Sequence, residues 1–187
     1  MIWLLHGRMA DQLLDERDPV TGAVIPAGST TYTPARFWER AVGVVTPHRA
    51  QQGLIVTRLQ NLFGGTGVPA AAIRGAVDTV ERFQGQQRDV IIASFAVGDP
   101  DAIADEEEFL MSLRRFNVMA SRARAKLVVL VSREVVDHLA AELEVLRDSR
   151  LLKVFAESFC NGHQPMTLGY IEGGVAESRP GEIRFPL

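Results

Sequence analysis

Short runs of apolar, largely β-branched residues alternate with segments of helical periodicity along most of this chain. None of the runs approaches the roughly 20 residues that a membrane-spanning helix needs. A strand that is apolar on both faces has to be covered on both faces, as in parallel sheets with helices above and below. The pattern therefore predicts an α/β fold, a parallel sheet with helices on both faces. The runs predicted as strands are 42–46, 76–79, 89–95 and 127–131.

The segments between these runs are predicted as helices and one loop. Apolar residues recur at a helical spacing between positions 54 and 62, and again between 135 and 146. The acidic stretch 99–108 is predicted to be a solvated loop. Phe83, Phe95 and Phe116 lie beside apolar runs and are predicted to pack in the core. The predicted helices are 51–62, 108–124 with a break near 115–117, 135–147 and 151–158.

Turn-forming residues distinguish the two ends of the chain from its centre. We divide the chain into an N-terminal segment of irregular structure or short strands (1–40), a central domain (41–160) and a C-terminal tail or hairpin (161–187). With 187 residues, of which 47% are hydrophobic and 23% charged, the chain is long enough for one domain with a full core. The net charge of -3 excludes a domain that binds nucleic acid through an overall basic charge. Any nucleic-acid contact must be local or shared with another domain.

The cysteine content and the first residues of the chain indicate the cellular compartment in which the protein is expected. Cys160 is the one cysteine, so no disulfide can form within the chain, which fits a reducing compartment. Cys160 and His163 by themselves do not make a tetrahedral metal site, and no metal ligands are predicted. The apolar residues 1–5 lack the basic leader and the length of a signal peptide. We expect no membrane association and a cytoplasmic location, or a nuclear one in a eukaryote.

A cluster of arginines lies just before the last apolar run. A guanidinium group is always charged and its planar fork matches phosphate oxygens, so a cluster at the edge of a buried strand predicts a phosphate site. The chain has no Walker A pattern, because the glycines at 64–67 are not followed by the required lysine and hydroxyl; this stretch is predicted to be a plain turn. An apolar strand ending in Asp-Glu is also missing. The clustered arginines are Arg114, Arg115, Arg122 and Arg124.

Three segments resemble motifs IV, V and VI of superfamily-1 helicases. They read GVVTPHRAQ at 43–51, TVERFQGQQRDVIIASF at 79–95 and RRFNVMASRARAK at 114–126. In the branch of the RNA-surveillance helicases and replication helicase-nucleases, the patterns are G-V-I-T-P-Y-R-A-Q, T-V-D-x-F-Q-G-x-E-x-D-V-I-I-x-S and R-R-L-N-V-A-x-T-R-A-R. The order and rough spacing match over about half of the chain. The resemblance implies a RecA-like fold and the second domain of a two-domain motor, the one without a P-loop.

The resemblance also implies a cofactor and partners. ATP with Mg²⁺ would bind between this domain and an N-terminal RecA-like domain of the same protein, which would supply the Walker A lysine and the magnesium ligands. The implied reaction is ATP hydrolysis coupled to translocation along single-stranded nucleic acid, DNA rather than RNA, with unwinding of duplex. The chain alone is expected to be inactive. The alternative is a non-catalytic RecA-like module that binds a nucleotide or a protein, and the departures from the family patterns at 48 and 87 keep this alternative open.

The same resemblance implies which residues are expected to bind the nucleotide. Arg122 is expected to be the arginine finger, which stabilises charge developing on the transferring phosphoryl group. His48, Arg49 and Gln51 are expected to bind the nucleotide, with His48 where the family has tyrosine. Gln87 is expected to bind it as well and stands where the family has glutamate. Arg122 is thus expected to share one pocket with residues 48–51 and 84–87.

The remaining residues are expected either to hold the nucleotide site in place or to contact the nucleic acid. Arg124 completes the nucleotide-binding set and, like Arg115, is expected to hold its helix against neighbouring loops. Asp89 is expected to form an ion pair with an arginine of the third motif. Thr79 is expected to donate a hydrogen bond to a nucleic-acid phosphate. Gln84 is expected to form part of the turn that couples the nucleotide cleft to the nucleic-acid track.

Overall fold

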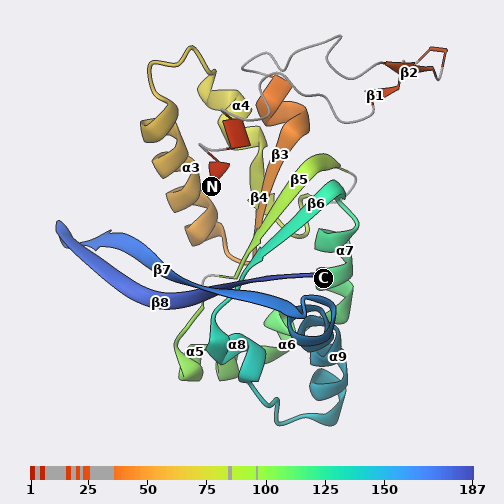
Figure 1. Cartoon of the computed structure of the whole chain (residues 1–187), viewed down its shortest axis with the longest axis vertical. Helices are drawn as coiled ribbons and strands as arrows, with labels where there is room; N and C mark the ends of the chain where they lie inside the picture. The colour runs from red at the N-terminus through yellow and green to blue at the C-terminus, as the bar shows by residue number, and fades with distance from the viewer. Residues whose placement is uncertain are drawn as a thin grey trace.

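A computed structural model of the chain describes residues 1–2, 5–6, 16–17, 20–21, 23–25, 36–83, 86–95 and 97–187. Its centre is a four-stranded parallel sheet with the strand order β4-β3-β5-β6 and helices on both faces (Figure 1). The α/β, RecA-like fold predicted from the sequence is confirmed. The strands are β3 (Val42–Thr46), β4 (Val77–Thr79), β5 (Arg88–Ser94) and β6 (Ala123–Leu130).

The register of the parallel strands defines two edges of the sheet. Thr46 is paired with Thr79, and Ser94 with Leu130, so the strands end together at what we call the carboxyl edge. Arg88 is paired with Ala123 where β5 and β6 begin, at what we call the amino edge. β5 has seven residues, so at about 3.3 Å per residue the two edges lie about 20 Å apart.

Each face of the sheet has its own hydrophobic core. Helices α3 (Arg49–Phe63) and α4 (Ala70–Gly75) cover one face with the π-helical turn η1 (Phe37–Ala41). Helices α7 (Leu113–Ala120), α8 (Arg133–Asp137) and α9 (Leu143–Lys153) cover the other face. The two cores explain why the strands read as continuous apolar runs. The predicted core residues Phe83, Phe95 and Phe116 are all buried on the second face.

The acidic stretch 99–108 is not the loop predicted from the sequence. It forms α5 (Pro100–Asp105) and α6 (Glu107–Leu110). The Asp99 carboxylate caps α5 by accepting hydrogen bonds from two following backbone amides, and proline occupies the first turn. These are signals for the start of a helix. Ile103 and Leu110 are buried and tie the segment to the core, so its charge does not imply that it is detached from the domain.

Two of the predicted helices are interrupted, one of them at a side-chain cap. The break in 108–124 falls at 111–112 rather than at 115–117, because Ser112 caps α7 by accepting a hydrogen bond from the next turn. β6 then begins at residue 123 instead of 127. The predicted helix 135–147 is divided into α8, capped by Ser132, and α9. The predicted helix 151–158 is the end of α9 followed by the π-helix η2 (Val154–Phe159).

The two ends of the chain contain antiparallel strands. Near the N-terminus, β1 (Glu16–Arg17) pairs with β2 (Val24–Ile25). At the C-terminus, β7 (Gly162–Glu172) and β8 (Val175–Phe185) form a hairpin that projects as an arm from the domain (Figure 1). Gly173 and Gly174 in its turn have φ of 58° and 85°, a conformation that glycine adopts without a steric penalty.

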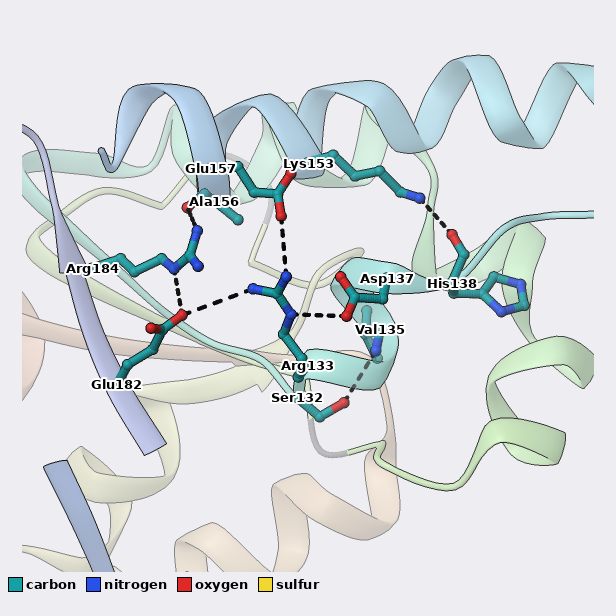
Figure 2. Close-up of polar contacts among 10 residues, drawn as sticks. All are labelled: Ser132, Arg133, Val135, Asp137, His138, Lys153, Ala156, Glu157, Glu182 and Arg184. Carbon is teal, nitrogen blue, oxygen red and sulfur yellow. Dashed lines mark hydrogen bonds and ion pairs between the residues drawn. The ribbon is translucent and has the colours of Figure 1, made fainter. Parts of the chain in front are cut away.

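Ion pairs around Arg133 connect this arm to the domain. From the start of α8, the guanidinium reaches Asp137 at 2.8 Å, Glu157 of η2 at 3.5 Å and Glu182 of β8 at 3.9 Å (Figure 2). The hydrogen bond to Asp137 is the main cause that raises the pKa of Arg133. Arg184 of β8 donates to a backbone carbonyl of η2 at 3.1 Å. The base of the arm is therefore held beside the carboxyl end of β6, where α8 begins.

Gly43 in β3 lies where a side chain cannot fit. A Cβ atom there would stand 2.6 Å from Cζ of Phe83 and 2.9 Å from Cγ of Arg88, both of which are buried. We expect Gly43→Ala to lower the free energy of unfolding by about 1–3 kcal/mol through overpacking. Gly53→Ala in α3, with no atom within 4 Å of the new Cβ, is the control and should stabilise the helix by about 0.5–1 kcal/mol. Urea unfolding of both variants checks this, and equal midpoints would contradict it.

Candidate nucleotide and nucleic-acid sites

Arg122 lies in the turn between α7 and β6, at the amino edge. Its backbone carbonyl accepts a hydrogen bond of 3.0 Å from the Arg88 amide, which fixes it beside β5. Its Nε donates to the carbonyl of Val118 at 3.3 Å, at the C-terminal end of α7, where a cation is favoured. Within the part of the chain that the structure describes, its two terminal nitrogens form no hydrogen bond or ion pair. The half-buried guanidinium is thus held through Nε, and its two terminal nitrogens are available to bind a ligand.

Arg124 and Asp89 form the ion pair predicted between motifs V and VI. Nη1 of Arg124 lies 3.2 Å from Oδ1 of Asp89, whose side chain is 2% exposed, and the Arg124 side chain is 29% exposed. The pair joins β6 to β5 and neutralises a carboxylate inside the sheet. Arg124 therefore has a structural task at the amino edge, and its contact with a nucleotide stays a prediction.

Arg88 is a charged residue of the amino edge that the sequence analysis missed. It is 9% exposed, and its terminal nitrogens donate to the Gln87 carbonyl at 3.0 Å and to the Gln86 side chain at 2.9 Å. Burial is the main cause that lowers the pKa of Arg88. The guanidinium also lies 5.4 Å from the ring centroid of Phe83. Arg88 thus ties down the backbone that carries Gln87, whose own side chain is exposed. The only feature of the sequence that could have indicated this role is that Arg88 directly precedes an apolar run.

At the carboxyl edge, Gln51 joins the ends of β3 and β5. The amide oxygen of Gln51 accepts a hydrogen bond from the buried Thr46 hydroxyl, and its nitrogen donates to Oγ of Ser94 at 2.9 Å. Gln51 comes from the first turn of α3, so this bridge also fixes where that helix begins. Gln51 is therefore placed to orient two hydroxyl groups at the strand ends.

A row of stacked side chains extends along the same edge. His48, the N-cap residue of α3, stacks on Phe109 of α6 with ring centroids 5.9 Å apart and an interplanar angle of 21°. The Arg115 guanidinium of α7 lies 3.9 Å from the Phe109 ring centroid. Acids flank the row: His48 Nε2 is 3.1 Å from Oε2 of Glu106, and Arg115 Nε is 3.0 Å from Oε1 of Glu81.

Glu81 links this row to Thr79, the predicted phosphate contact. Burial alone would raise the pKa of Glu81, but hydrogen bonds from the backbone, from Arg115 and from the Thr79 hydroxyl, together with the Arg115 charge, hold it below its ordinary value of 4.5. Glu81 is therefore ionised at neutral pH and is paired with Arg115. Gln84, the other predicted nucleic-acid contact, lies outside the described residues.

The structure does not bring the predicted nucleotide-binding residues into one pocket. Arg122 is bonded to Arg88 at the start of β5, whereas Gln51 is bonded to Ser94 at the end of the same strand. The expectation that Arg122 shares a pocket with residues 48–51 is wrong. Residues that follow one parallel strand and residues that precede another lie at opposite edges of the sheet. Those at the carboxyl edge are His48, Arg49 and Gln51, and those at the amino edge are Gln87, Arg122 and Arg124.

Among the described residues, no group of three or more His, Cys, Asp or Glu side chains is arranged to hold a metal ion. Cys160 is buried, and burial raises the pKa of its thiol. No helix in the described ranges is long and apolar enough to cross a bilayer.

Comparison with known proteins supplies the family. An AAA domain family model matches residues 25–134. Probable RNA helicase armi of Drosophila melanogaster is 32% identical over 92 residues, 47% of this chain and 7% of that protein. Probable helicase senataxin of Mus musculus is 37% identical over 91 residues, 49% of this chain and 3% of that protein. DNA replication ATP-dependent helicase/nuclease DNA2 of Xenopus laevis is 33% identical over 89 residues, 48% of this chain and 8% of that protein.

The match to each of these relatives therefore spans less than a tenth of the relative's length. The family match, by contrast, covers more than half of this chain, including both sheet edges. The chain therefore belongs to the AAA domain family, as a domain of the helicase C-terminal type.

Proposed function

We propose that this chain is the C-terminal motor domain of an ATP-dependent helicase of superfamily 1 and that its two sheet edges have separate tasks. The amino edge, with Arg122, closes a nucleotide site whose other wall is the N-terminal RecA-like domain of the same protein. The carboxyl edge contacts single-stranded nucleic acid. The observation that carries the proposal is the Arg122 side chain, anchored through Nε while its terminal nitrogens are available.

Arg122 has the properties that an arginine finger needs. Its terminal nitrogens can donate two parallel hydrogen bonds to phosphate oxygens. Its anchorage to the end of α7 limits reorganisation when charge develops on the transferring phosphoryl group. Mg²⁺ bound with ATP would neutralise phosphate charge, and its carboxylate ligands would come from the partner domain. Gln87, exposed at the same edge, is available for the ribose or the phosphates.

The carboxyl edge has the chemistry of a phosphate track. Helix α3 begins there without an acidic residue in its first turn, and Arg49 in that turn is exposed. A helix N-terminus has partial positive charge, and hydroxyl and backbone N–H groups are common phosphate contacts. We therefore reassign His48 and Arg49 from the nucleotide to the nucleic acid, beside Thr79. Gln51 has a positioning role through its two hydroxyl partners.

Single-stranded DNA is the expected track. The relatives include proteins named as RNA helicases and one named for DNA replication, so the preference is measured by competition between oligonucleotides of the same length. Backbone contacts of this kind weaken as the salt concentration rises, and the dependence on salt reports how many phosphates are neutralised.

The experiment that tests the proposed function compares the isolated chain with the polypeptide that carries both motor domains. The isolated chain should bind single-stranded DNA weakly and release no phosphate from ATP, because the Walker A lysine and the magnesium ligands belong to the partner domain. The two-domain protein should hydrolyse ATP faster when single-stranded DNA is added. Robust hydrolysis by the isolated chain would contradict the proposal. Inactivity of the two-domain protein with DNA and with RNA would favour the non-catalytic alternative.

A further inference from the structure

Arg88 places a positive charge in the interior of the amino edge. The residue is 9% exposed, and among the described residues no carboxylate forms an ion pair with it. Its Nε is buried and has no hydrogen-bond partner in the same part of the chain. Burial, and then the charge of Arg40, lower the pKa of Arg88 against a smaller opposite effect of Glu39. Because a guanidinium stays charged in proteins, burying it here costs the domain stability.

Polar groups of the loop that precedes β5 compensate this cation in part. Nη1 of Arg88 donates to the Gln87 carbonyl at 3.0 Å, and Nη2 donates to Oε1 of Gln86 at 2.9 Å. Nη2 also lies 3.5 Å from the carbonyl of Gly75, at the end of α4. The ring centroid of Phe83 is 5.4 Å from the guanidinium. The planar fork therefore holds two consecutive residues of the loop in one fixed geometry.

The backbone of Arg88 contacts the second predicted nucleotide-binding residue of this edge. Its amide donates to the Arg122 carbonyl at 3.0 Å. Arg88 therefore holds Gln87 through its side chain and Arg122 through its main chain. A substitution of the Arg88 side chain removes the first contact and keeps the second, so it can separate the two roles in an experiment.

Stability alone does not explain a cation at this position. Replacing a buried charge with an apolar side chain of similar volume is often neutral or stabilising. Gln86 is half-buried and Gln87 is exposed, so water can replace the hydrogen bonds that both residues would lose. Groups that cost stability in this way are expected chiefly at functional sites.

We propose that Arg88 is a positioning residue of the nucleotide site: its fork holds Gln87 in the orientation that presents the Gln87 amide to the ribose or the phosphates of ATP. The inference rests on the proposed function of the amino edge as the nucleotide side of the domain. Losing one neutral hydrogen bond weakens binding by about threefold to tenfold. The contact of Arg122 with the Arg88 amide is kept, so kcat should change little.

The test introduces Arg88→Met into the two-domain protein. Isothermal titration calorimetry with adenylyl imidodiphosphate and Mg²⁺ should give a Kd about threefold to tenfold above that of the wild type. Phosphate release at saturating ATP should give a kcat within about twofold of the wild type, because only binding shared by the ground and transition states is lost. The matched control is Arg74→Met, the same replacement at an exposed arginine of α4. Its Kd should equal that of the wild type.

A stability measurement distinguishes positioning from a merely structural role. Urea unfolding of the 187-residue chain should give Arg88→Met a midpoint equal to or above that of the wild type. A lower midpoint together with losses in both Kd and kcat would assign Arg88 to the fold and overturn the inference. An unchanged Kd in a folded Arg88→Met would overturn it as well.

Arg88→Lys keeps the inference testable if Arg88→Met does not fold. Lysine retains the positive charge and hydrogen-bond donors but lacks the planar fork that holds Gln86 and Gln87 together. The Kd of Arg88→Lys should therefore lie above that of the wild type and below the value expected for complete loss of the Gln87 contact. A Kd equal to that of the wild type would show that the fork is not needed and would overturn the inference.

A double-mutant cycle shows whether Arg88 acts through Gln87. Gln87→Ala alone should weaken binding of the analogue by a similar factor, and Arg88→Met should add less than about twofold in that background. Losses that multiply would overturn the inference, while ATP hydrolysis by the wild type keeps the proposed function. A wild-type two-domain protein that neither binds the analogue nor hydrolyses ATP would remove the proposed nucleotide site and this inference together.

Discussion

Replacing Arg122 with alanine lowers ATP hydrolysis by the two-domain protein by about 10³-fold or more, the range found for arginine fingers. The loss is expected in kcat, because the guanidinium acts on charge that develops only in the transition state. The affinity for single-stranded DNA should change by less than about twofold, because Arg122 lies at the amino edge, about 20 Å from the proposed track. Steady-state phosphate release and oligonucleotide anisotropy measure the two quantities.

Arg114→Ala is the matched control for this experiment. Arg114 is an exposed arginine in the first turn of α7, at the far end of that helix from Arg122, so the substitution removes the same charge without changing the amino edge. Its kcat should stay within about twofold of the wild type, as expected for a surface substitution away from the site. A loss below tenfold in Arg122→Ala, or an equal loss in both variants, would remove Arg122 from the role of arginine finger.

Replacing Arg124 with alanine lowers the free energy of unfolding by about 3 kcal/mol, the lower end of the range for breaking a buried ion pair. The substitution takes the cation away from the Asp89 carboxylate, which is 2% exposed. Partial exposure of Arg124 explains why the lower end is expected. Urea unfolding of the isolated chain measures the change, and Asp89→Asn in the Arg124→Ala background should recover part of it.

Lys126→Ala is the comparison variant, because Lys126 is exposed on the same strand. It should change stability by no more than about 0.5 kcal/mol. Arg122→Ala should also change stability little, since within the described ranges its side chain is engaged through Nε alone. Similar small losses in Arg124→Ala and Lys126→Ala would mean that the Arg124–Asp89 pair does not carry the stability assigned to it.

Most of the sheet could be predicted because its strands are buried on both faces. The run 42–46 coincides with β3, and the run 89–95 differs from β5 by one residue at each end. Hydrophobic burial acts on each residue of such a strand, so the pattern is continuous and easy to detect. The acidic segment was misjudged for the opposite reason: its charge indicated solvent, while the Asp99 cap and the buried Ile103 determined that it folds as helix.

The order of strands and site residues along the chain implies that the two edges are separate. His48 follows a strand and Arg122 precedes one, which in a parallel sheet means opposite edges. Grouping the residues by family motif, instead of by their place before or after a strand, merged two sites into one pocket. The ion pair of Asp89 with an arginine of the third motif was correct, because neighbouring parallel strands bring those two motifs together.

The family, the parallel sheet and the arginine-rich segment can be recognised from the amino-acid sequence, because they depend on local patterns of apolar and charged residues. The partner that each charged side chain takes is set by the packing of the folded domain. Arg115 stacks on the Phe109 ring and pairs with Glu81, and Arg124 pairs with Asp89. The terminal nitrogens of Arg122 form no hydrogen bond or ion pair among the described residues. Those pairings depend on distances between segments far apart in the chain, which are set when the helices pack on the sheet.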